Sequence, residues 1–384
     1  MYVCYKKYNS TNNNVTGNIV DALFNGQDIV EESVEDTADT ETKTIIVDNY
    51  NDGPISLTSI CATMQLVLSK VYRHPHPEEE YIHFKIPKKS GGLRNIDAPN
   101  EELKRDMKLI AGLLQYSLKL QYHNSAWAYI KGRDVVGATR EHLKNKSNWY
   151  LKIDLHNFFG SCTKEFILQQ LDQVYPFAQY KNNEVVREGL NKLVDLSLLN
   201  GSLPQGTPLS PMITNLIMIP VDYQITKLLN TLSNTGVIPK QRYVYTRYAD
   251  DIIISTKVKF NYRLVLDKIK ELFESTTPFT FNNDKVRFGS AAGRNWNLGI
   301  MCNKDYKATI GYRNKKQLKV MLHNYYNSVD NWELQELQWF LGQLSWLHNV
   351  EPDYYNGFLD YAKNKYDGLD LVGDLINRIK TYNS

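Results

Sequence analysis

The sequence lacks the features of membrane, secreted and disulfide-rich proteins. It contains no run of about 18 apolar residues, and no apolar stretch of signal-peptide type follows its first residues. Its 4 cysteines lie far apart, and no two of them have the spacing of a metal finger. We therefore expect a cytoplasmic protein with no membrane contact, with buried reduced thiols, and without a zinc site or a disulfide framework.

Charge is unevenly distributed along the chain. Residues 1–55 hold ten of the 42 acidic side chains but only three of the 45 basic ones, so the rest of the chain carries a charge of +10. A basic body behind an acidic leader is typical of a protein that binds a polyanion, although many solvated surfaces look similar. The leader is most simply a solvated tail, and it could also contact a partner or mask a basic groove.

The length of 384 residues allows two or three domains, or one multi-lobed enzyme. Residues 1–52 are Asn-rich and then acidic, with little periodicity. Residues 53–311 contain helical and strand patterns, beginning with an apolar helical stripe from Leu57 to Val71. Residues 312–384 are helical, with interleaved leucine and tryptophan. Such an aromatic, basic end is usually core, but it could also be a nucleic-acid clamp.

A basic hairpin is predicted near the start of the central region. Tyr81 to Pro87 is typical of a strand, residues 88–94 supply a basic turn with two glycines, and Ile96 and Ala98 continue a return strand. Lysine and arginine heads that converge on a glycine turn can hold a triphosphate. A solvated turn explains the residues equally well.

Aspartates occur at the ends of two further predicted strands. The run from Trp149 to Leu155 alternates in polarity and ends at Asp154, while Asp250 and Asp251 lie between an aromatic run and Ile252 to Ile254. The acidic pair is therefore expected in a tight hairpin connection, with a cation nearby because like charges repel. Taken alone, each aspartate could simply belong to a polar turn.

Three further segments complete the pattern. Residues 203–211 form a proline-rich loop that leads into an apolar helix, so its amides could serve a base or phosphate. Residues 126–130 are predicted to be a strand before a basic turn. His142 is expected to pack or to hydrogen-bond rather than to catalyse.

In this order, the strand ending in aspartate, the Pro-Gln-Gly loop and the Tyr-Ala-Asp-Asp hairpin resemble the palm of a reverse transcriptase, and the basic hairpin resembles that family's fingers. The resemblance runs from about Leu57 to the end of the sequence. It implies an α+β, right-hand polymerase fold, with fingers and an antiparallel palm sheet in residues 53–311 and a helical thumb in residues 312–384. It also implies an RNA-directed DNA polymerase.

The resemblance assigns catalytic and metal-binding roles to the acidic residues. Nucleotidyl transfer uses two Mg²⁺ ions, with Mn²⁺ as an alternative, and carboxylates from neighbouring strands supply the hard oxygen ligands such ions prefer. Asp154 and Asp250 are the first-choice ligands, Asp251 stands beside them as a more replaceable neighbour, and Leu155 would offer its backbone oxygen.

The nucleotide-binding roles follow from the same resemblance. Phe159 matches the sugar gate, where an aromatic ring collides with a ribose 2′-hydroxyl, and Tyr248 would lie under the primer end. Lys285 is a proton donor to pyrophosphate or else a surface lysine. The remaining residues would hold the phosphates or shape the nucleotide pocket: Lys88, Arg94, Gln205 and Gly206.

The subfamily expectation rests on two departures from retron enzymes. Their Asn-Ala-x-x-His segment is represented by residues 138–142, which keep only His142, and their late Val-Thr-Gly by residues 297–299, Asn-Leu-Gly. We therefore expect a defence-associated reverse transcriptase of the abortive-infection or unknown-group type, which copies a cognate structured non-coding RNA into cDNA from dNTPs in anti-phage defence. Alternatives are retron-type msDNA synthesis, template-independent or protein-primed DNA synthesis, an RNA-directed RNA polymerase and a binding protein with a decayed palm. Homo-oligomerisation stays open.

Overall fold

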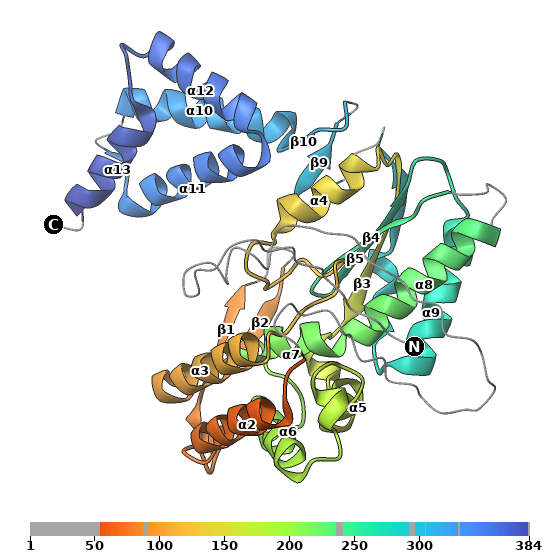
Figure 1. The fold of residues 1–384 in the computed structure, drawn as a ribbon. Helices are drawn as coiled ribbons and strands as arrows, with labels where there is room; N and C mark the ends of the chain where they lie inside the picture. The colour runs from red at the N-terminus through yellow and green to blue at the C-terminus, as the bar shows by residue number, and fades with distance from the viewer. Residues whose placement is uncertain are drawn as a thin grey trace, which may run out of the picture.

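The computed structural model describes residues 54–87, 91–235, 241–291, 296–303, 305–328 and 331–382. The leader expected at residues 1–52 and the phosphate ligand expected at Lys88 lie outside these ranges, as does the side chain of Arg94. Within the described ranges, helices and antiparallel strands alternate in three regions, a helical base with a hairpin, a central sheet and a distal helical bundle (Figure 1).

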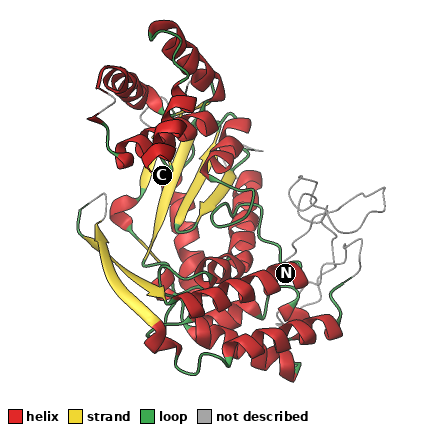
Figure 2. Ribbon diagram, turned by 90° about the vertical axis from the view of Figure 1, so that its left-hand side faces the viewer, coloured by secondary structure: helices red, strands yellow, loops and turns green. Residues whose placement is uncertain are grey.

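The helical base packs around the first predicted helix. Helix α2 (Leu57–Val71) lies against α3 (Glu101–Ser117) and α6 (Glu184–Ser197), with α5 (Lys164–Leu171) beside α6. The approach of α2 to α6 is close, because a Cβ on Gly189 would lie 2.8 Å from the Met64 sulfur. The base carries a hairpin, β1 (Tyr81–Pro87) paired with β2 (Leu93–Pro99), which stands apart from the central sheet (Figure 2).

The central sheet has the strand order β4-β5-β3-β6, with β7 also paired to β3. Its strands are antiparallel to their neighbours: β3 (Trp149–His156), β4 (Val244–Tyr248), β5 (Asp251–Thr256), β6 (Thr280–Phe281) and β7 (Arg287–Ser290). The helices α7 (Leu209–Ile217), α8 (Ile219–Thr235) and α9 (Tyr262–Thr276) belong to this region. Both predicted aspartate strands are confirmed.

The predicted strand at residues 126–130 is wrong. Only one bridge forms there, between Ala126 and Arg247, through Arg247 N–H to Ser125 O and Trp127 N–H to Arg247 O. The chain then turns away, because Tyr129 has a φ of 61° in the left-handed region. The alternation of small and aromatic residues at 126–130 therefore belongs to a loop that pairs with the edge of the sheet at one residue.

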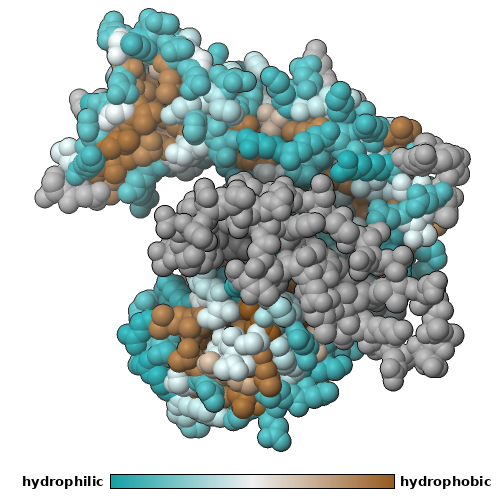
Figure 3. Space-filling model, in the orientation of Figure 1, coloured by the Kyte–Doolittle hydropathy of each residue, from teal (hydrophilic) through white to brown (hydrophobic). Residues whose placement is uncertain are grey.

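The distal bundle follows a small sheet of β8 (Trp296–Asn297), β9 (Ile300–Cys302) and β10 (Ala308–Thr309). It consists of α10 (Gly311–Ser328), α11 (Leu334–Val350), α12 (Pro352–Lys365) and α13 (Leu371–Tyr382) around a hydrophobic cluster of their own. Apolar side chains also gather on the face that Figure 3 shows. The change from strands to helices thus falls at Gly311, next to the predicted boundary.

Short 3₁₀ helices occupy Pro77–Glu80, Phe159–Ser161, Phe177–Tyr180 and Asn283–Lys285. Among the described residues, no helix is long and apolar enough to cross a membrane. Cys162 and Cys302 are buried thiols outside any disulfide, as expected, whereas Cys61 is only partly buried.

His142 is buried in α4 (Val135–Lys144) and hydrogen-bonds through both ring nitrogens. Nδ1 lies 2.6 Å from Ser255 Oγ on β5, and Nε2 lies 2.8 Å from Thr246 Oγ1 on β4. The packing role predicted for this histidine is confirmed. Burial, followed by the charge of Lys152, lowers the pKa of His142 to about 3.

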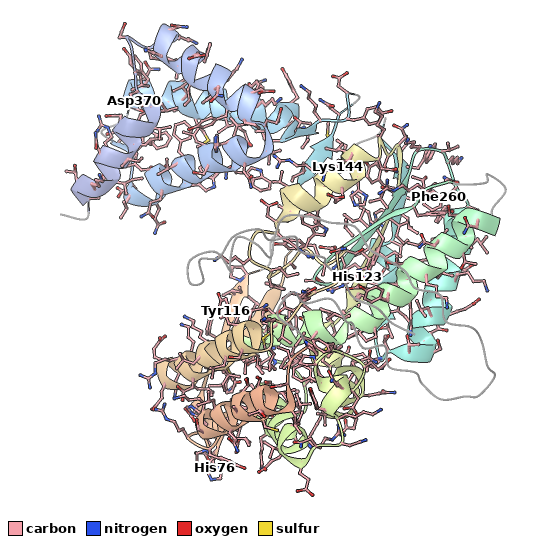
Figure 4. The ribbon with its side chains drawn as sticks, in the orientation of Figure 1. His76, Tyr116, His123, Lys144, Phe260 and Asp370 are labelled. Carbon is pink, nitrogen blue, oxygen red and sulfur yellow. The ribbon has the colours of Figure 1, made fainter. Side chains whose placement is uncertain are left out.

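This buried histidine should make the protein less stable in mild acid. Between the unfolded pKa of about 6.5 and the folded pKa, only the unfolded chain binds the proton, so stability falls as pH drops below about 6.5 and is unaffected by His142 above it. His142→Gln should flatten the fall between about pH 6.5 and about pH 5, measured by thermal melting. His76→Gln, on an exposed histidine (Figure 4), is the surface control; equal slopes in wild type and His142→Gln would contradict the prediction.

Candidate active site

The acidic pair occupies the tight connection between β4 and β5. Tyr248 ends β4, Asp251 begins β5, and these two residues pair across the ladder. Ala249 and Asp250 form the turn between them, and Ala249 adopts a φ of 56°. The turn therefore holds a non-glycine residue in the left-handed region, a strained conformation that needs support from neighbouring contacts.

Strand pairing brings the third aspartate to this turn. Asp154 is directly opposite Asp251 in the β3–β5 register, and Leu155 N–H donates to Asp250 O at 3.1 Å. Burial, then the charges of Asp250 and Asp154, raise the pKa of Asp251 to about 6. The site thus concentrates negative charge where water is partly excluded.

Lys285 is the cation that this charge attracts. It lies in the 3₁₀ helix Asn283–Lys285, and its Nζ is 3.0 Å from each carboxylate oxygen of Asp154. Lys285 is 60% exposed while Asp154 is 14% exposed, so the ammonium reaches inward from the solvent side. The contact is a charge-assisted hydrogen bond at the mouth of the site.

A cavity of about 1460 Å³ opens over these residues. It is lined by the β1–β2 hairpin, the turn after β3 and the proline-rich loop. The sequence-predicted residues on its wall are Asp154, Phe159, Gln205, Gly206, Asp250 and Lys285. Asp251 and Tyr248 adjoin the cavity through the turn. The side chain of Leu155 is buried, which leaves only its backbone for the predicted role.

The proline-rich loop packs closely against strand β2 of the hairpin and is hydrogen-bonded to it. Gln205 O accepts a hydrogen bond from Asp97 N–H at 3.2 Å. Gly206 has a φ of 117°, and a Cβ there would lie 3.2 Å from Ile96 Cγ2 and 3.3 Å from Asp97 O. Glycine is therefore required both by conformation and by the closeness of β2. Thr207 Oγ1 then accepts from Ser210 N–H at 3.2 Å, at the start of α7.

The turn after β3 sets the position of Phe159. Asn157 has a φ of 46°, and its carbonyl accepts from Ser161 N–H at 2.9 Å and from Ser161 Oγ at 3.0 Å. Gly160 sits over Asn157 so closely that a Cβ would lie 2.5 Å from the amide nitrogen. Phe159 packs on Phe158 with ring centroids 5.5 Å apart, so it contacts the core and also lines the cavity.

A buried ion pair supports the acidic turn from behind. Arg247 and Asp222 are both 0% exposed, with Arg247 Nη2 2.8 Å from Asp222 Oδ2. Asp222 also accepts from the Tyr245 hydroxyl at 2.6 Å, and Arg247 Nη1 donates to Asn215 Oδ1 and to Ala249 O, each at 3.3 Å. Burial opposes the charge on Arg247, but Asp222 outweighs it and raises the pKa of the guanidinium.

Sequence reasoning missed this network. The available signals were an arginine inside an otherwise apolar and aromatic strand, and a lone aspartate after the apolar run that opens α8. A charged residue in such a place needs a partner, but the partner is 25 positions away and no local periodicity identifies it.

The carboxylates fit a divalent cation in charge and donor type. Carboxylate oxygens are hard ligands, and the neighbouring charges of Asp250 and Asp154 add to burial in raising the pKa of Asp251. In the part of the chain that the structure describes, no three His, Cys, Asp or Glu side chains already converge as a metal-binding group. Asp154 instead faces the Lys285 ammonium, which occupies the position of a counter-cation.

The fold and this site define a right-hand nucleotidyltransferase, and comparison with known proteins identifies the family. The family described as "Reverse transcriptase (RNA-dependent DNA polymerase)" matches residues 86–325. The chain belongs to this family and is an RNA-directed DNA polymerase. An RNA template follows from this membership, and reverse transcriptase domains generally use divalent metal ions.

Similar proteins include several retron enzymes. Retron Ec73 reverse transcriptase of Escherichia coli is 31% identical over 326 residues, which cover 81% of this chain and 94% of that protein. Retron Ec83 reverse transcriptase of the same organism is 25% identical, with coverages of 76% and 88%. Retron Mx162 reverse transcriptase of Myxococcus xanthus is 26% identical, with coverages of 79% and 66%. The predicted bacterial, retron-like enzyme is confirmed.

Solved structures with a similar arrangement include telomerases. Apo telomerase from Candida tropicalis truncated from its C-terminal domain has a TM-score of 0.41 and 14% identity, covering 61% of this chain and 56% of that one. Telomerase from Candida albicans in complex with a TWJ fragment of telomeric RNA has a TM-score of 0.41, 13% identity and coverages of 83% and 65%. The chain thus spans 56% of the first telomerase and 65% of the second. The right-hand polymerase fold follows from the family and from the elements described above.

Breaking the buried ion pair should destabilise the protein strongly. Arg247→Met leaves Asp222 charged and unpaired in the core, which should cost about 3–5 kcal/mol of the free energy of unfolding. Urea unfolding measures this change. The matched control is Arg187→Met, which breaks the half-exposed pair with Asp172 and should cost about 1 kcal/mol or less. Equal losses of unfolding free energy in the two variants would show that breaking the buried pair costs no more than breaking the exposed one.

Proposed function

We propose that the enzyme copies a cognate structured non-coding RNA into cDNA in anti-phage defence. The observation that carries the catalytic part is the pairing of Asp154 with Asp251 at the edge of a cavity that Phe159 and the Gln205–Gly206 loop also line. The departures from retron segments at residues 138–142 and 297–299 support a defence-associated type. Retron-type msDNA synthesis is the second candidate, favoured by the names of the similar proteins.

In the proposed mechanism, Asp154, Asp250 and Asp251 hold two Mg²⁺ ions, with Mn²⁺ as a substitute and with the Leu155 carbonyl as a further ligand. Bound ions of this kind lower the pKa of the primer 3′-hydroxyl and neutralise the triphosphate. The register and the Leu155–Asp250 hydrogen bond hold the carboxylates at fixed spacing before substrate arrives. This preorganisation lowers the cost of reaching the transition state.

The other proposed roles concern the nucleotide and the primer. Phe159 excludes a ribose 2′-hydroxyl, and the Gln205–Gly206 loop shapes the base pocket between hairpin and palm. Lys285 donates a proton to the leaving pyrophosphate, for which its exposed ammonium at the cavity wall is suited. Lys88 and Arg94 hold phosphates and Tyr248 supports the primer end. The proposed partners are the template RNA, the cDNA product, dNTPs and, as an open alternative, a second copy of the chain.

The decisive experiment uses the purified protein with its co-purifying RNA. With Mg²⁺ and dNTPs, it should make DNA whose sequence is complementary to that RNA, and digestion of the RNA beforehand should abolish synthesis. DNA made without RNA, or DNA that shifts on protease digestion, would instead favour template-independent or protein-primed synthesis. A non-coding locus beside the gene, with loss of phage resistance on its deletion, would support the defence role; unchanged resistance would remove it.

The two adjacent aspartates should differ in importance. Asp250→Asn should lower the rate of nucleotide addition roughly a thousand-fold, because a lost metal ligand removes several kcal/mol of transition-state stabilisation. Asp251→Asn should lower it only about ten- to hundred-fold, because Asp251 is the more replaceable contributor to the metal site beside the first-choice ligands Asp154 and Asp250. Single-turnover primer extension measures both rates. Equal losses would show that the ranking is wrong.

Phe159 should control the choice between deoxyribonucleotides and ribonucleotides. Phe159→Ala removes the ring that meets the 2′-hydroxyl, so the ratio of kcat/KM for dNTP over rNTP should fall by about ten-fold or more, the weight of one well-placed steric contact. The control is Phe84→Ala, on an exposed phenylalanine of β1 that does not line the cavity. A ratio unchanged in Phe159→Ala would remove its role as the gate.

A further inference from the structure

Helix α4 lies between the sheet and the distal bundle (Figure 1). Val136, which is 0% exposed, belongs to the hydrophobic cluster of the bundle together with Leu347 and Val350 of α11. Seven residues later, Leu143 belongs to a second cluster with Tyr150 of β3 and Ile253 of β5. One short helix therefore contributes side chains both to a small cluster on the central sheet and to the core of the distal bundle.

The palm end of α4 is fixed by polar contacts. His142 binds Ser255 on β5 and Thr246 on β4, the two strands joined by the acidic turn. Ser255 Oγ also donates to Ser147 Oγ at 2.8 Å, so the chain after α4 is tied to the same strand. A Cβ on Gly137 would lie 2.3 Å from the Trp127 ring, which shows how closely the helix is packed. The helix has little freedom to move relative to the palm.

The thumb end of α4 holds one residue of α11 from two sides. Asp134 caps α4 through Oδ1, which accepts from Gly137 N–H at 2.6 Å, and its Oδ2 accepts from Asn349 Nδ2 at 3.1 Å. Arg140 Nη2 donates to Asn349 O at 3.2 Å. The last turn of α11 is thereby bracketed by residues from the start and the middle of α4. These bonds are exposed, so they can break without opening the core.

We propose that α4 is the joint between palm and thumb, and that the bracket of Asn349 by Asp134 and Arg140 sets how firmly the thumb holds the primer–template. Asp134, Arg140 and Asn349 are positioning residues, since none of them lines the active-site cavity. The inference rests on the proposed function and adds that the primer–template lies between these two regions. Breaking the bracket loosens the grip and shortens the stretch of DNA made per binding event, while the chemistry at the turn continues.

The same geometry gives the packing of His142, at the end of the segment 138–142, a part in the joint. His142 is 0% exposed and both of its ring nitrogens are engaged, so it cannot contact a nucleic acid. Its role is to fasten the joint to the strands that carry the acidic turn. Lys144, in the last turn of α4, marks this end of the helix in Figure 4.

The test compares full-length wild type with Asn349→Ala, Arg140→Ala and the double variant. The control is Asn356→Ala, on an exposed asparagine of α12 in the same thumb, outside the bracket. Two exposed hydrogen bonds correspond to roughly a three- to ten-fold change in an equilibrium constant. The double variant should therefore release a fluorescent RNA–DNA primer–template roughly three- to ten-fold faster in a chase without nucleotides.

Primer extension with a trap that prevents rebinding gives the second readout. The double variant should make shorter products, while the rate of the first nucleotide addition stays within about two-fold of wild type, since the turn keeps its own supports. Arg140→Lys should restore most of the product length lost in Arg140→Ala, because lysine can still donate to the Asn349 carbonyl.

Three results would overturn the proposal that α4 is the joint. The first is unchanged release and product length in the double variant. The second is a loss of first-nucleotide addition as large as the loss of length, and the third is an equal effect of Asn356→Ala. If the wild type binds the duplex but makes no DNA, the proposed function fails, and the release rates still decide whether the bracket controls the grip.

Discussion

The register between β3 and β5 is the constraint on which the rest of the site depends. Six residue pairs run from Trp149 opposite Thr256 to Asp154 opposite Asp251. Leu151 and Ile153 pack with Ile254 and Ile252 in the main core, and a shift by one residue would expose this face. Burial of the apolar face therefore fixes the position of the acidic face. The carboxylates are gathered at the strand ends by hydrophobic packing, which supplies the free energy that their mutual repulsion costs.

A turn with adjacent aspartates and a left-handed alanine does not hold its shape unaided. Arg247 reaches it through the Ala249 carbonyl, and Asp222 and Asn215 hold the guanidinium in place from α8 and α7. A buried ion pair of this kind adds little net stability, because the desolvation of both charges nearly cancels their attraction. The ion pair instead holds the turn in a single geometry. The polar network behind the site therefore holds the carboxylates at a fixed spacing where they face the charged cavity.

The sequence predicted those parts of the fold and site that local patterns determine. Strands β3 and β5, the β1–β2 hairpin and the helical stripe of α2 follow from residue spacing alone, and the order of Asp154, the Gln205–Gly206 loop and Asp250 indicated the family. Long-range contacts were beyond such patterns. Asp97 and Gln205, or Arg247 and Asp222, meet only after the chain folds, and no periodicity links them. The strand predicted at residues 126–130 was wrong for a related reason, because the backbone conformation of Tyr129 depends on its tertiary surroundings.

Placement of the distal bundle follows from the same strands that place the acidic turn. Thr246 lies two residues before Tyr248 at the end of β4, and its hydroxyl binds His142 of α4. Ser255 makes the matching contact from β5, so α4 rests on the hairpin whose far end carries Asp250. Through Val136 and the hydrogen bonds to Asn349, the distal bundle is connected to that hairpin by one short helix. The bundle and the carboxylates are therefore positioned by the same two strands.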